Sequence, residues 1–266
     1  MAGRFFERYG PWALVAGAAE GLGAEFARRV AKRGLCVLLA DRDRAGAAAR
    51  AREIAATSDV EALAVDVDLG ADDAWDRLYE AMAGHEVGLL VYNAAVSHVG
   101  PFLEQPLEGK LEQLDVNCRG PLRLVHELAP GMAARGRGGI VLLSSMAGLA
   151  GHALVASYGA TKAYNLVLAE ALWEELRSFG VDVLAVCPGP TRTPGYESSG
   201  SRLPSAFVAD PAAVAEEALD ALGRGPVVVT GAGNRLVAQL LRRALPHSLA
   251  AAAMGRLMRT IYPHAR

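Results

Sequence analysis

The chain has 266 residues, of which 52% are hydrophobic, and this is enough apolar material for a large core. Its 27 basic and 29 acidic residues nearly cancel, so the overall charge predicts no nucleic-acid partner. One region departs from this balance, because residues 231–266 contain six arginines and no acidic residue. This composition fits a basic surface helix or an oligomer-forming helix, or a contact with a membrane surface or an acidic partner.

The three cysteines, Cys36, Cys118 and Cys187, lie far apart and have no neighbouring histidine cluster. We therefore expect free thiols in a reducing compartment, and neither a metal site nor a disulfide framework. The first ten residues lack the uninterrupted apolar stretch of a signal peptide. No apolar run reaches the roughly 20 residues that a membrane-spanning helix needs. We expect a cytoplasmic protein without a transmembrane segment.

Short apolar runs alternate with longer amphipathic, alanine-rich segments in chain order. The apolar runs predict seven buried strands, at residues 12–16, 35–40, 62–67, 87–92, 140–144, 181–187 and 226–230. The segments between them predict helices at residues 21–33, 44–57, 71–84, 103–135, 157–179 and 211–223. This alternation predicts an α/β fold with a doubly wound, Rossmann-type parallel sheet.

No linker divides the chain, so residues 1–266 are expected to form one domain with its core at 11–230. Residues 188–211 are rich in proline, glycine and serine, which predicts a long surface loop. Loops of that length are usually functional or disordered, and residues 190–210 are expected to act as a substrate lid. The tail, residues 231–266, predicts one or two helices broken near Pro246.

A glycine-rich turn follows the first predicted strand and opens a helix. Gly17, Gly21 and Gly23 would let the backbone turn tightly and approach a pyrophosphate closely. The N-terminus of the following helix would face those phosphates with unpaired N–H groups. The alternative is a turn that serves packing alone, but its position after the first strand favours nucleotide binding.

Asp41 ends the second predicted strand, where a carboxylate can bind the ribose hydroxyls of an adenosine. It would repel a 2′-phosphate, as would Glu20, so we expect NAD. Arg42 could instead bind that phosphate, which keeps NADP as the alternative. Asp41 could also be only a helix cap. Asp66, after the third strand, could contact adenine or have only a loop or capping role.

Tyr158 and Lys162 are four residues apart on a predicted helix and therefore share a face. A phenol with a pKa of about 10 is a poor base, and a nearby ammonium would lower that pKa. Ser145 ends the fifth strand, where its hydroxyl could stabilise charge on a substrate oxygen; Ser144 is the adjacent alternative. Asn117 is a poor helix former in mid-helix, which suggests a polar role, an exposed side chain or a local kink.

The order of these motifs resembles that of short-chain dehydrogenases/reductases over residues 11–230. The segment Tyr9-Gly10-Pro11-Trp12-Ala13-Leu14 and the turn Gly-Ala-Ala-Glu-Gly-Leu-Gly look more like the ketoacyl and hydroxysteroid reductase branch. The resemblance rests on Gly17-x-x-x-Gly21-x-Gly23, Asn93-Ala94-Ala95, Asn117, Ser145, Tyr158-x-x-x-Lys162 and Pro188-Gly189. The chain departs from the family pattern at Tyr92 and Ala95, where Asn-Asn-Ala-Gly is usual, and at Ala16, where threonine is usual.

The resemblance implies that Tyr158 is the general acid/base and that Lys162 lowers its pKa and holds the nicotinamide ribose. Ser145 would polarise the carbonyl, Asn117 would hold a water behind Lys162, and Thr193 would hold the carboxamide. The implied cofactor contacts are Gly17, Glu20, Gly21, Leu22, Gly23, Asp41, Arg42, Asp66, Val67, Asn93, Ala94, Tyr158, Lys162, Pro188, Gly189, Thr191 and Thr193.

The substrate pocket is expected to form from apolar loops at the carboxyl edge of the sheet, which predicts a hydrophobic ketone or secondary alcohol, such as a steroid. The expected substrate contacts are Ser145, Met146, Val96, His98, His152 and Tyr158. The resemblance also implies a homodimer or homotetramer that pairs through residues 103–135 and 157–179. The rival functions are a non-catalytic nucleotide sensor or scaffold, and a sugar-nucleotide epimerase or dehydratase, for which the 36 residues after the last strand leave little room.

Overall fold

Seven parallel strands form one sheet in the order β3-β2-β1-β4-β5-β6-β7 in the computed structural model, which describes residues 2–241 and 246–265. The strands are β1 (Trp12–Ala16), β2 (Cys36–Asp41), β3 (Ala62–Asp66), β4 (Val87–Tyr92), β5 (Gly138–Leu143), β6 (Val181–Cys187) and β7 (Val227–Val229). The predicted doubly wound sheet is confirmed. Strand order reverses between β1 and β4, and the crevice outside the carboxyl ends at that point is where such sheets bind ligands.

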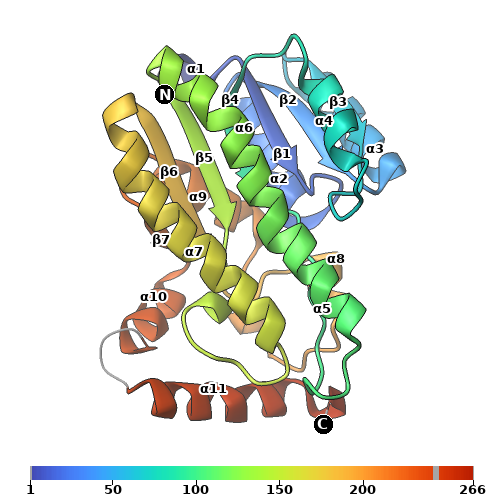
Figure 1. The fold of residues 1–266 in the computed structure, drawn as a ribbon, viewed down its shortest axis with the longest axis vertical. Coiled ribbons are helices and arrows are strands. Elements are labelled where there is room, and N and C mark those ends of the chain that lie inside the picture. Colours follow the sequence, from blue (N-terminus) through green and yellow to red (C-terminus); the bar gives the residue numbers. More distant parts are fainter. Residues whose placement is uncertain (1, 242–245, 266) are drawn as a thin grey trace.

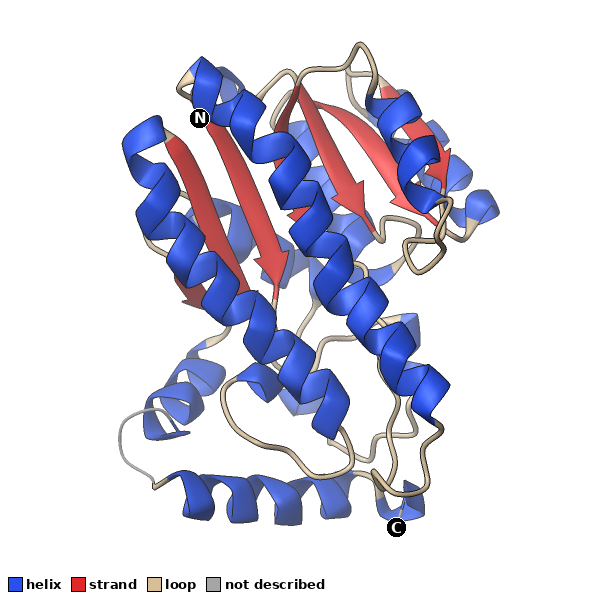
Figure 2. Cartoon of the chain, viewed as in Figure 1, coloured by secondary structure: helices blue, strands red, loops and turns tan. Residues whose placement is uncertain are grey.

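Helices cover both faces of the sheet (Figure 2). They are α1 (Ala2–Tyr9), α2 (Gly21–Lys32), α3 (Arg44–Thr57), α4 (Ala74–Met82), α5 (Leu107–Leu114), α6 (Gly120–Arg135), α7 (Ala156–Leu176), α8 (Pro194–Ser198), α9 (Pro211–Ala221), α10 (Ala232–Gln239) and α11 (His247–Ile261). One core cluster packs α4, α6 and α7 against the sheet through residues such as Trp75, Leu124 and Leu166. A second packs α2, α3 and α9 against the opposite face through Phe26, Ile54 and Leu219.

The edge strand β3 differs from the prediction of a strand buried on both faces. Leu63 is 38% exposed, and of the five residues of β3 only Val65 is buried. The cause is its place in the sheet, because β3 pairs only with β2 at one edge. Apolar residues in sequence could not distinguish this edge strand from the central strands.

The helix predicted at residues 103–135 is interrupted. α5 begins at Leu107, one turn of π-helix occupies Asp115–Arg119, and α6 then continues to Arg135. Asn117 lies within the π-turn, so the helix is irregular at the position that its poor helix propensity singled out. The turn changes the register between α5 and α6 and directs Asn117 into the protein, where it is fully buried.

The first helix, α1, and the last, α11, lie at opposite ends of the sheet. α1 was not predicted; Arg8 and Tyr9 anchor it by donating to the carboxylate of Asp182 at 2.8 and 2.7 Å. In the tail, α10 and α11 confirm the predicted helices, and α11 starts directly after Pro246. Figure 1 shows α11 lying across the end of the molecule toward which the strands point.

The predicted loop at 188–211 contains the short helix α8, one 3₁₀ turn (Ser205–Phe207) and a bridge between Thr191 and Ala209. Within residues 2–241 and 246–265, no helix combines the length and the apolar character that crossing a bilayer requires. The same part of the chain contains no group of three side chains able to hold a metal ion.

Candidate active site

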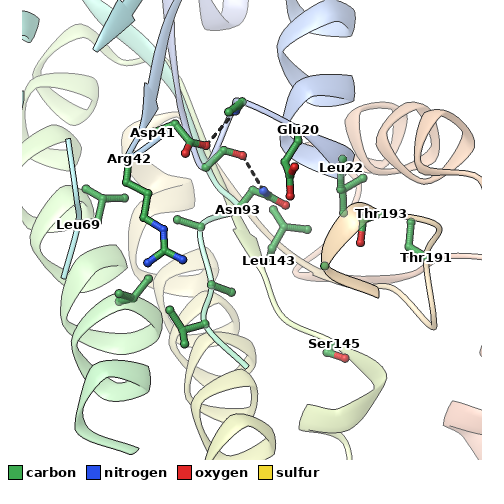
Figure 3. A pocket seen from close by; sticks show the side chains of 18 of the residues that line it. Glu20, Leu22, Asp41, Arg42, Leu69, Asn93, Leu143, Ser145, Thr191 and Thr193 are labelled. Carbon is green, nitrogen blue, oxygen red and sulfur yellow. Dashed lines mark hydrogen bonds between the residues drawn. The ribbon is translucent and has the colours of Figure 1, made fainter. Parts of the chain in front are cut away.

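A pocket of about 520 Å³ lies at the carboxyl edge of the sheet, beside the point where strand order reverses. Its lining comes from the segments after β1, β2, β3, β4, β5 and β6 and from α7. Figure 3 shows Asp41 and Arg42 on one side, Thr191 and Thr193 on the other, and Ser145 at a distance from both pairs. The pocket therefore contains both the predicted nucleotide-binding residues and the predicted catalytic residues Ser145, Tyr158 and Lys162.

The glycine turn approaches its neighbours too closely for larger side chains. A Cβ on Gly17, whose φ is +78°, would lie 2.7 Å from the backbone of Ala94. A Cβ on Gly23 would lie only 1.8 Å from the carbonyl oxygen of Gly17, and a Cβ on Gly21 would meet Thr193 at 2.9 Å. Asn93 stabilises the turn by donating from Nδ2 to the Gly17 carbonyl at 2.9 Å (Figure 3). Glycine is thus required here by geometry.

Asp41 connects the end of β2 to this turn. Its Oδ2 accepts a hydrogen bond from the Ala19 amide at 2.9 Å, and its Oδ1 accepts one from the Asp43 amide at 2.9 Å. Arg42 is exposed, and its guanidinium lies 3.8 Å from the carboxylate of Glu112 on α5. The side chain of Asp43, rather than that of Asp41, caps α3 by accepting from the Gly46 amide. The alternative in which Asp41 is only the cap of this helix is therefore wrong.

Tyr158 and Lys162 lie on α7 and line the same pocket as Ser145. The Lys162 Nζ is 5.6 Å from the centre of the Tyr158 ring and donates to the Leu143 carbonyl at 2.7 Å. Ser145 Oγ accepts from the Ala147 amide at 3.1 Å, and the Ser145 side chain also hydrogen-bonds with Tyr158. Ser144 is buried and donates to the Lys162 carbonyl at 2.7 Å, so its hydroxyl supports the helix instead.

The pKa of Tyr158 differs from the prediction. Burial raises the pKa of Tyr158, the hydrogen bond with Ser145 lowers it, and the charge of Tyr262 raises it. Burial lowers the pKa of Lys162 to about 8, against the opposing effects of Cys118 and Cys187. The predicted lowering of the Tyr158 pKa is therefore not found, because burial dominates and the Lys162 ammonium donates to a backbone carbonyl.

Asn117 lies behind the pocket rather than on its wall. Its Oδ1 accepts from the Val96 amide at 2.8 Å, and its Nδ2 donates to the Val96 carbonyl and to Thr161 Oγ1 at 2.9 and 3.0 Å. Its backbone carbonyl accepts from Asn165 at 3.0 Å. These bonds connect the segment after β4 to α7. Asn117 therefore positions the pocket walls, and its binding of a water stays a prediction.

The pocket brings together most of the predicted cofactor residues and fewer of the predicted substrate residues. Two predicted cofactor contacts, Gly23 and Asp66, are not on the lining; Gly23 packs inside the turn, and Asp66 is exposed at the end of β3. Three predicted substrate contacts, Met146, His98 and His152, are also absent from it. His98 Nε2 lies 3.4 Å from Glu112, and His152 Nδ1 lies 2.7 Å from the Ala150 carbonyl.

Several lining residues were not predicted. They include the residues Ala19, Asp43, Asp68, Leu69, Ala95, Val116, Leu143 and Gly195. Asp68 and Leu69 could have been found, because they directly follow a predicted strand end. Val116 could not, since its place on the wall depends on the π-turn.

The lining fits a dinucleotide. The bare glycine backbone and the N-terminus of α2 lie between a carboxylate at Asp41 and the hydroxyl and amine of Tyr158 and Lys162. Such a helix start favours phosphate. Thr193 caps α8 by accepting from the Tyr196 amide, and so keeps its hydroxyl proton for a polar partner.

Residues 11–203 match the family model described as short chain dehydrogenase. The chain therefore belongs to the short-chain dehydrogenase/reductase family and is an oxidoreductase acting on the alcohol/ketone pair. A very-long-chain 3-oxoacyl-CoA reductase of Pyricularia oryzae is 34% identical over 82% of this chain and 66% of its own length. The chain thus spans about two thirds of that relative. A 7beta-hydroxysteroid dehydrogenase of Mediterraneibacter gnavus is 29% identical over 86% of this chain and 89% of its own length.

Solved structures agree with this assignment. A structure from work on 7beta-hydroxysteroid dehydrogenase stereoselectivity superposes with a TM-score of 0.87 at 29% identity, covering 94% of this chain and 98% of the other. A short-chain dehydrogenase from Sphingobium yanoikuyae in complex with NADPH has a TM-score of 0.77 at 29% identity, covering 90% and 97%. The ketoacyl and hydroxysteroid branch indicated by the motifs is confirmed.

Proposed function

We propose that the protein interconverts a hydrophobic secondary alcohol and its ketone, with a nicotinamide dinucleotide as cofactor and Tyr158 as general acid/base. The observation that carries this proposal is the shared pocket, in which Ser145, Tyr158 and Lys162 adjoin the glycine turn. A nucleotide sensor or scaffold would not need these three groups together.

In ketone reduction, Tyr158 gives its phenolic proton to the carbonyl oxygen, while the Ser145 hydroxyl donates a hydrogen bond to the same oxygen. When bound, the reduced nicotinamide supplies the hydride that the carbonyl carbon accepts. Lys162, whose Nζ lies 5.6 Å from the centre of the Tyr158 ring, is proposed to hold the nicotinamide ribose. Alcohol oxidation reverses the proton step, with the Tyr158 phenolate accepting the hydroxyl proton.

The raised pKa of Tyr158 has a consequence for direction. A phenol with a raised pKa is protonated at neutral pH and can act as the acid that reduction requires. Oxidation requires the phenolate and becomes faster as the pH rises toward that pKa. We therefore infer that reduction uses the protonated phenol, the main form near pH 7, and that the rate of oxidation rises with pH.

NAD is the proposed cofactor. The carboxylate of Asp41 lies on the pocket wall at the end of β2, and Glu20 adds a second negative charge. Both charges oppose a 2′-phosphate. Arg42 also lines the pocket and supports NADP as the alternative, as does the NADPH complex of the Sphingobium relative. Asp41 outweighs Arg42 in this proposal because two backbone amides fix its carboxylate, whereas the Arg42 side chain is 64% exposed.

The proposed substrate is a bulky, lipid-like ketone. Relatives named for hydroxysteroid and long-chain 3-oxoacyl substrates support this class. His98 and His152 are already engaged by Glu112 and the Ala150 carbonyl, so apolar contacts remain the basis of recognition.

A homodimer through α6 and α7 is the proposed assembly. These helices form an apolar groove lined by Leu122, Val125, His126, Ala129, Pro130, Ala133, Leu168, Leu172, Leu176 and Phe179. An exposed apolar surface of this kind marks an interaction site. None of the described cysteines forms a disulfide, and a location in the cytoplasm stays a prediction.

The test is oxidation of NADH or NADPH with a panel of steroid ketones, 3-oxoacyl thioesters and small polar ketones, followed by absorbance. Tyr158→Phe should bind the cofactor normally and lose turnover by about 10²–10⁴-fold. Tyr164→Phe is the matched control, because this tyrosine lies on the same helix, is partly exposed and is absent from the pocket lining. Turnover of Tyr158→Phe within twofold of the parent would refute the proposal, and turnover of polar ketones alone would refute the substrate class.

A further inference from the structure

The outward faces of α10 and α11 expose large apolar side chains at the carboxyl end of the molecule. Leu236, Val237 and Leu240 are exposed on and directly after α10, and Leu249 and Leu257 are exposed on α11. Leu236 and Leu249 each exceed half of full exposure, at 65% and 57%. We call these five residues, with Arg256 and Arg259, the tail surface. α10 and α11 are consecutive helices of the chain, and a large exposed apolar surface marks an interaction site.

The opposite face of α11 is fixed to the protein. Ala250, Gly255 and Met258 are buried, and a Cβ on Gly255 would lie 3.5 Å from the Cβ of Ala153. At the end of the helix, the Ile261 carbonyl accepts from the Arg202 amide at 2.9 Å. Because these contacts hold the inner face, Leu249 and Leu257 cannot turn inward and remain on the outer face.

The charge of the tail is entirely positive. Residues 231–266 contain six arginines and no aspartate or glutamate. Arg256 and Arg259 are exposed on α11, whereas Arg235 is paired with Glu217 of α9; the other three lie outside the described residues. Positions 249, 256 and 257 share one helix face, since they are separated by seven and eight residues. This face therefore combines leucine with arginine.

We infer that the tail surface binds the surface of an anionic lipid bilayer. A helix that lies in a membrane interface buries an apolar face and places arginines beside anionic headgroups, which is the composition found here. A second copy of the chain fits less well, because a two-fold contact centred on this surface would bring arginines against arginines with no carboxylate in the tail to pair them. The groove between α6 and α7 offers another copy a separate face.

Bilayer contact would also orient the molecule. α11 packs on Ala153 and bonds to Arg202, and both belong to loops at the carboxyl end of the sheet, where the pocket lies (Figure 1). Attachment through α11 would turn this end toward the lipid. The inference does not depend on the proposed reaction, because binding to vesicles requires no turnover.

The test is co-sedimentation of the full chain with vesicles of phosphatidylglycerol and phosphatidylcholine at a one-to-three ratio, and with vesicles of phosphatidylcholine alone. The parent should bind the anionic vesicles at least about tenfold more strongly, and higher salt should weaken this binding. Leu249→Gln with Leu257→Gln should reduce the partition coefficient about tenfold, and Arg256→Gln with Arg259→Gln about as much.

Two control variants lie on other surfaces. Leu63→Gln on β3 and Arg52→Gln on α3 change exposed residues of the same types and should leave vesicle binding unchanged. All variants should keep the parent melting temperature and turnover of a water-soluble ketone, so a failed reaction is distinguished from failed attachment.

Equal sedimentation with the two vesicle types would overturn the inference, as would parent-like binding by both tail variants. A loss of self-association in the tail variants, with no vesicle binding by the parent, would show instead that a second copy covers this surface.

Discussion

Asp41 fixes the glycine turn and supplies the negative charge at one end of the pocket, so Asp41→Asn should separate these two effects. The carboxylate accepts two backbone amides, each at 2.9 Å. In asparagine one oxygen becomes an NH₂ group that cannot accept, and one bond is lost. For this half-exposed group, that loss costs about 1 kcal/mol of unfolding free energy. The melting temperature should therefore fall by a few degrees.

The effect on cofactor preference should be larger. A carboxylate and a phosphate within about 4 Å repel by about 4 kcal/mol at an effective dielectric constant near 20. Partial exposure and salt reduce this to about 1–2 kcal/mol, or roughly tenfold in the ratio of dissociation constants. Asp41→Asn should accordingly shift the ratio of NADP to NAD dissociation constants about tenfold toward NADP.

Calorimetric titration of both cofactors measures this ratio directly. Arg42→Gln serves as the companion variant, because it should weaken NADP alone if the guanidinium contacts the 2′-phosphate. An unchanged ratio in Asp41→Asn, in a folded protein that still binds NAD, would refute electrostatic discrimination by this carboxylate. Asp41 would then serve only to hold the turn.

Three further predictions concern the turn, the buried lysine and the helix groove. Gly23→Ala should weaken cofactor binding at least tenfold and lower the melting temperature, because its Cβ would lie 1.8 Å from the Gly17 carbonyl. Gly225→Ala, with open space around it and no place on the pocket lining, should do neither. Lys162 has a pKa lowered to about 8, so its side chain holds the proton more tightly in the unfolded chain than in the folded one. The unfolding free energy of the parent should therefore rise between pH 8 and 10 relative to that of Lys162→Met, by at most about 3 kcal/mol. Parallel curves of unfolding free energy against pH for the two proteins would contradict this. Leu172→Glu should convert a dimer to a monomer in sedimentation equilibrium, and an unchanged mass would exclude this groove.

The periodicity of apolar residues was enough to predict the sheet and most helices. Continuous apolar runs predicted strands within two residues of each end, since a strand covered on both faces needs such a run. The motif glycines, Ser145, Tyr158 and Lys162 could be identified for a similar reason. Each follows a strand end or lies at helical spacing, so its position in the chain determines its position at the sheet edge.

The tertiary structure decided how these residues are used. The pKa of Tyr158 depends on burial and on Tyr262, a residue more than one hundred positions away in the chain. The sequence singled out Asn117 because asparagine is unfavourable in the middle of a helix. Only the fold shows that a π-turn directs its side-chain amide to Val96 and Thr161.

The predicted substrate contacts also depended on the fold and not on the sequence alone. Loop position suggested His98 and His152, yet both are engaged by other groups in the folded chain. Local sequence carries backbone preference and apolar periodicity, whereas electrostatics and loop contacts arise from groups that only the fold brings together. Composition could thus identify a basic tail, while the fold decided which of its faces is exposed.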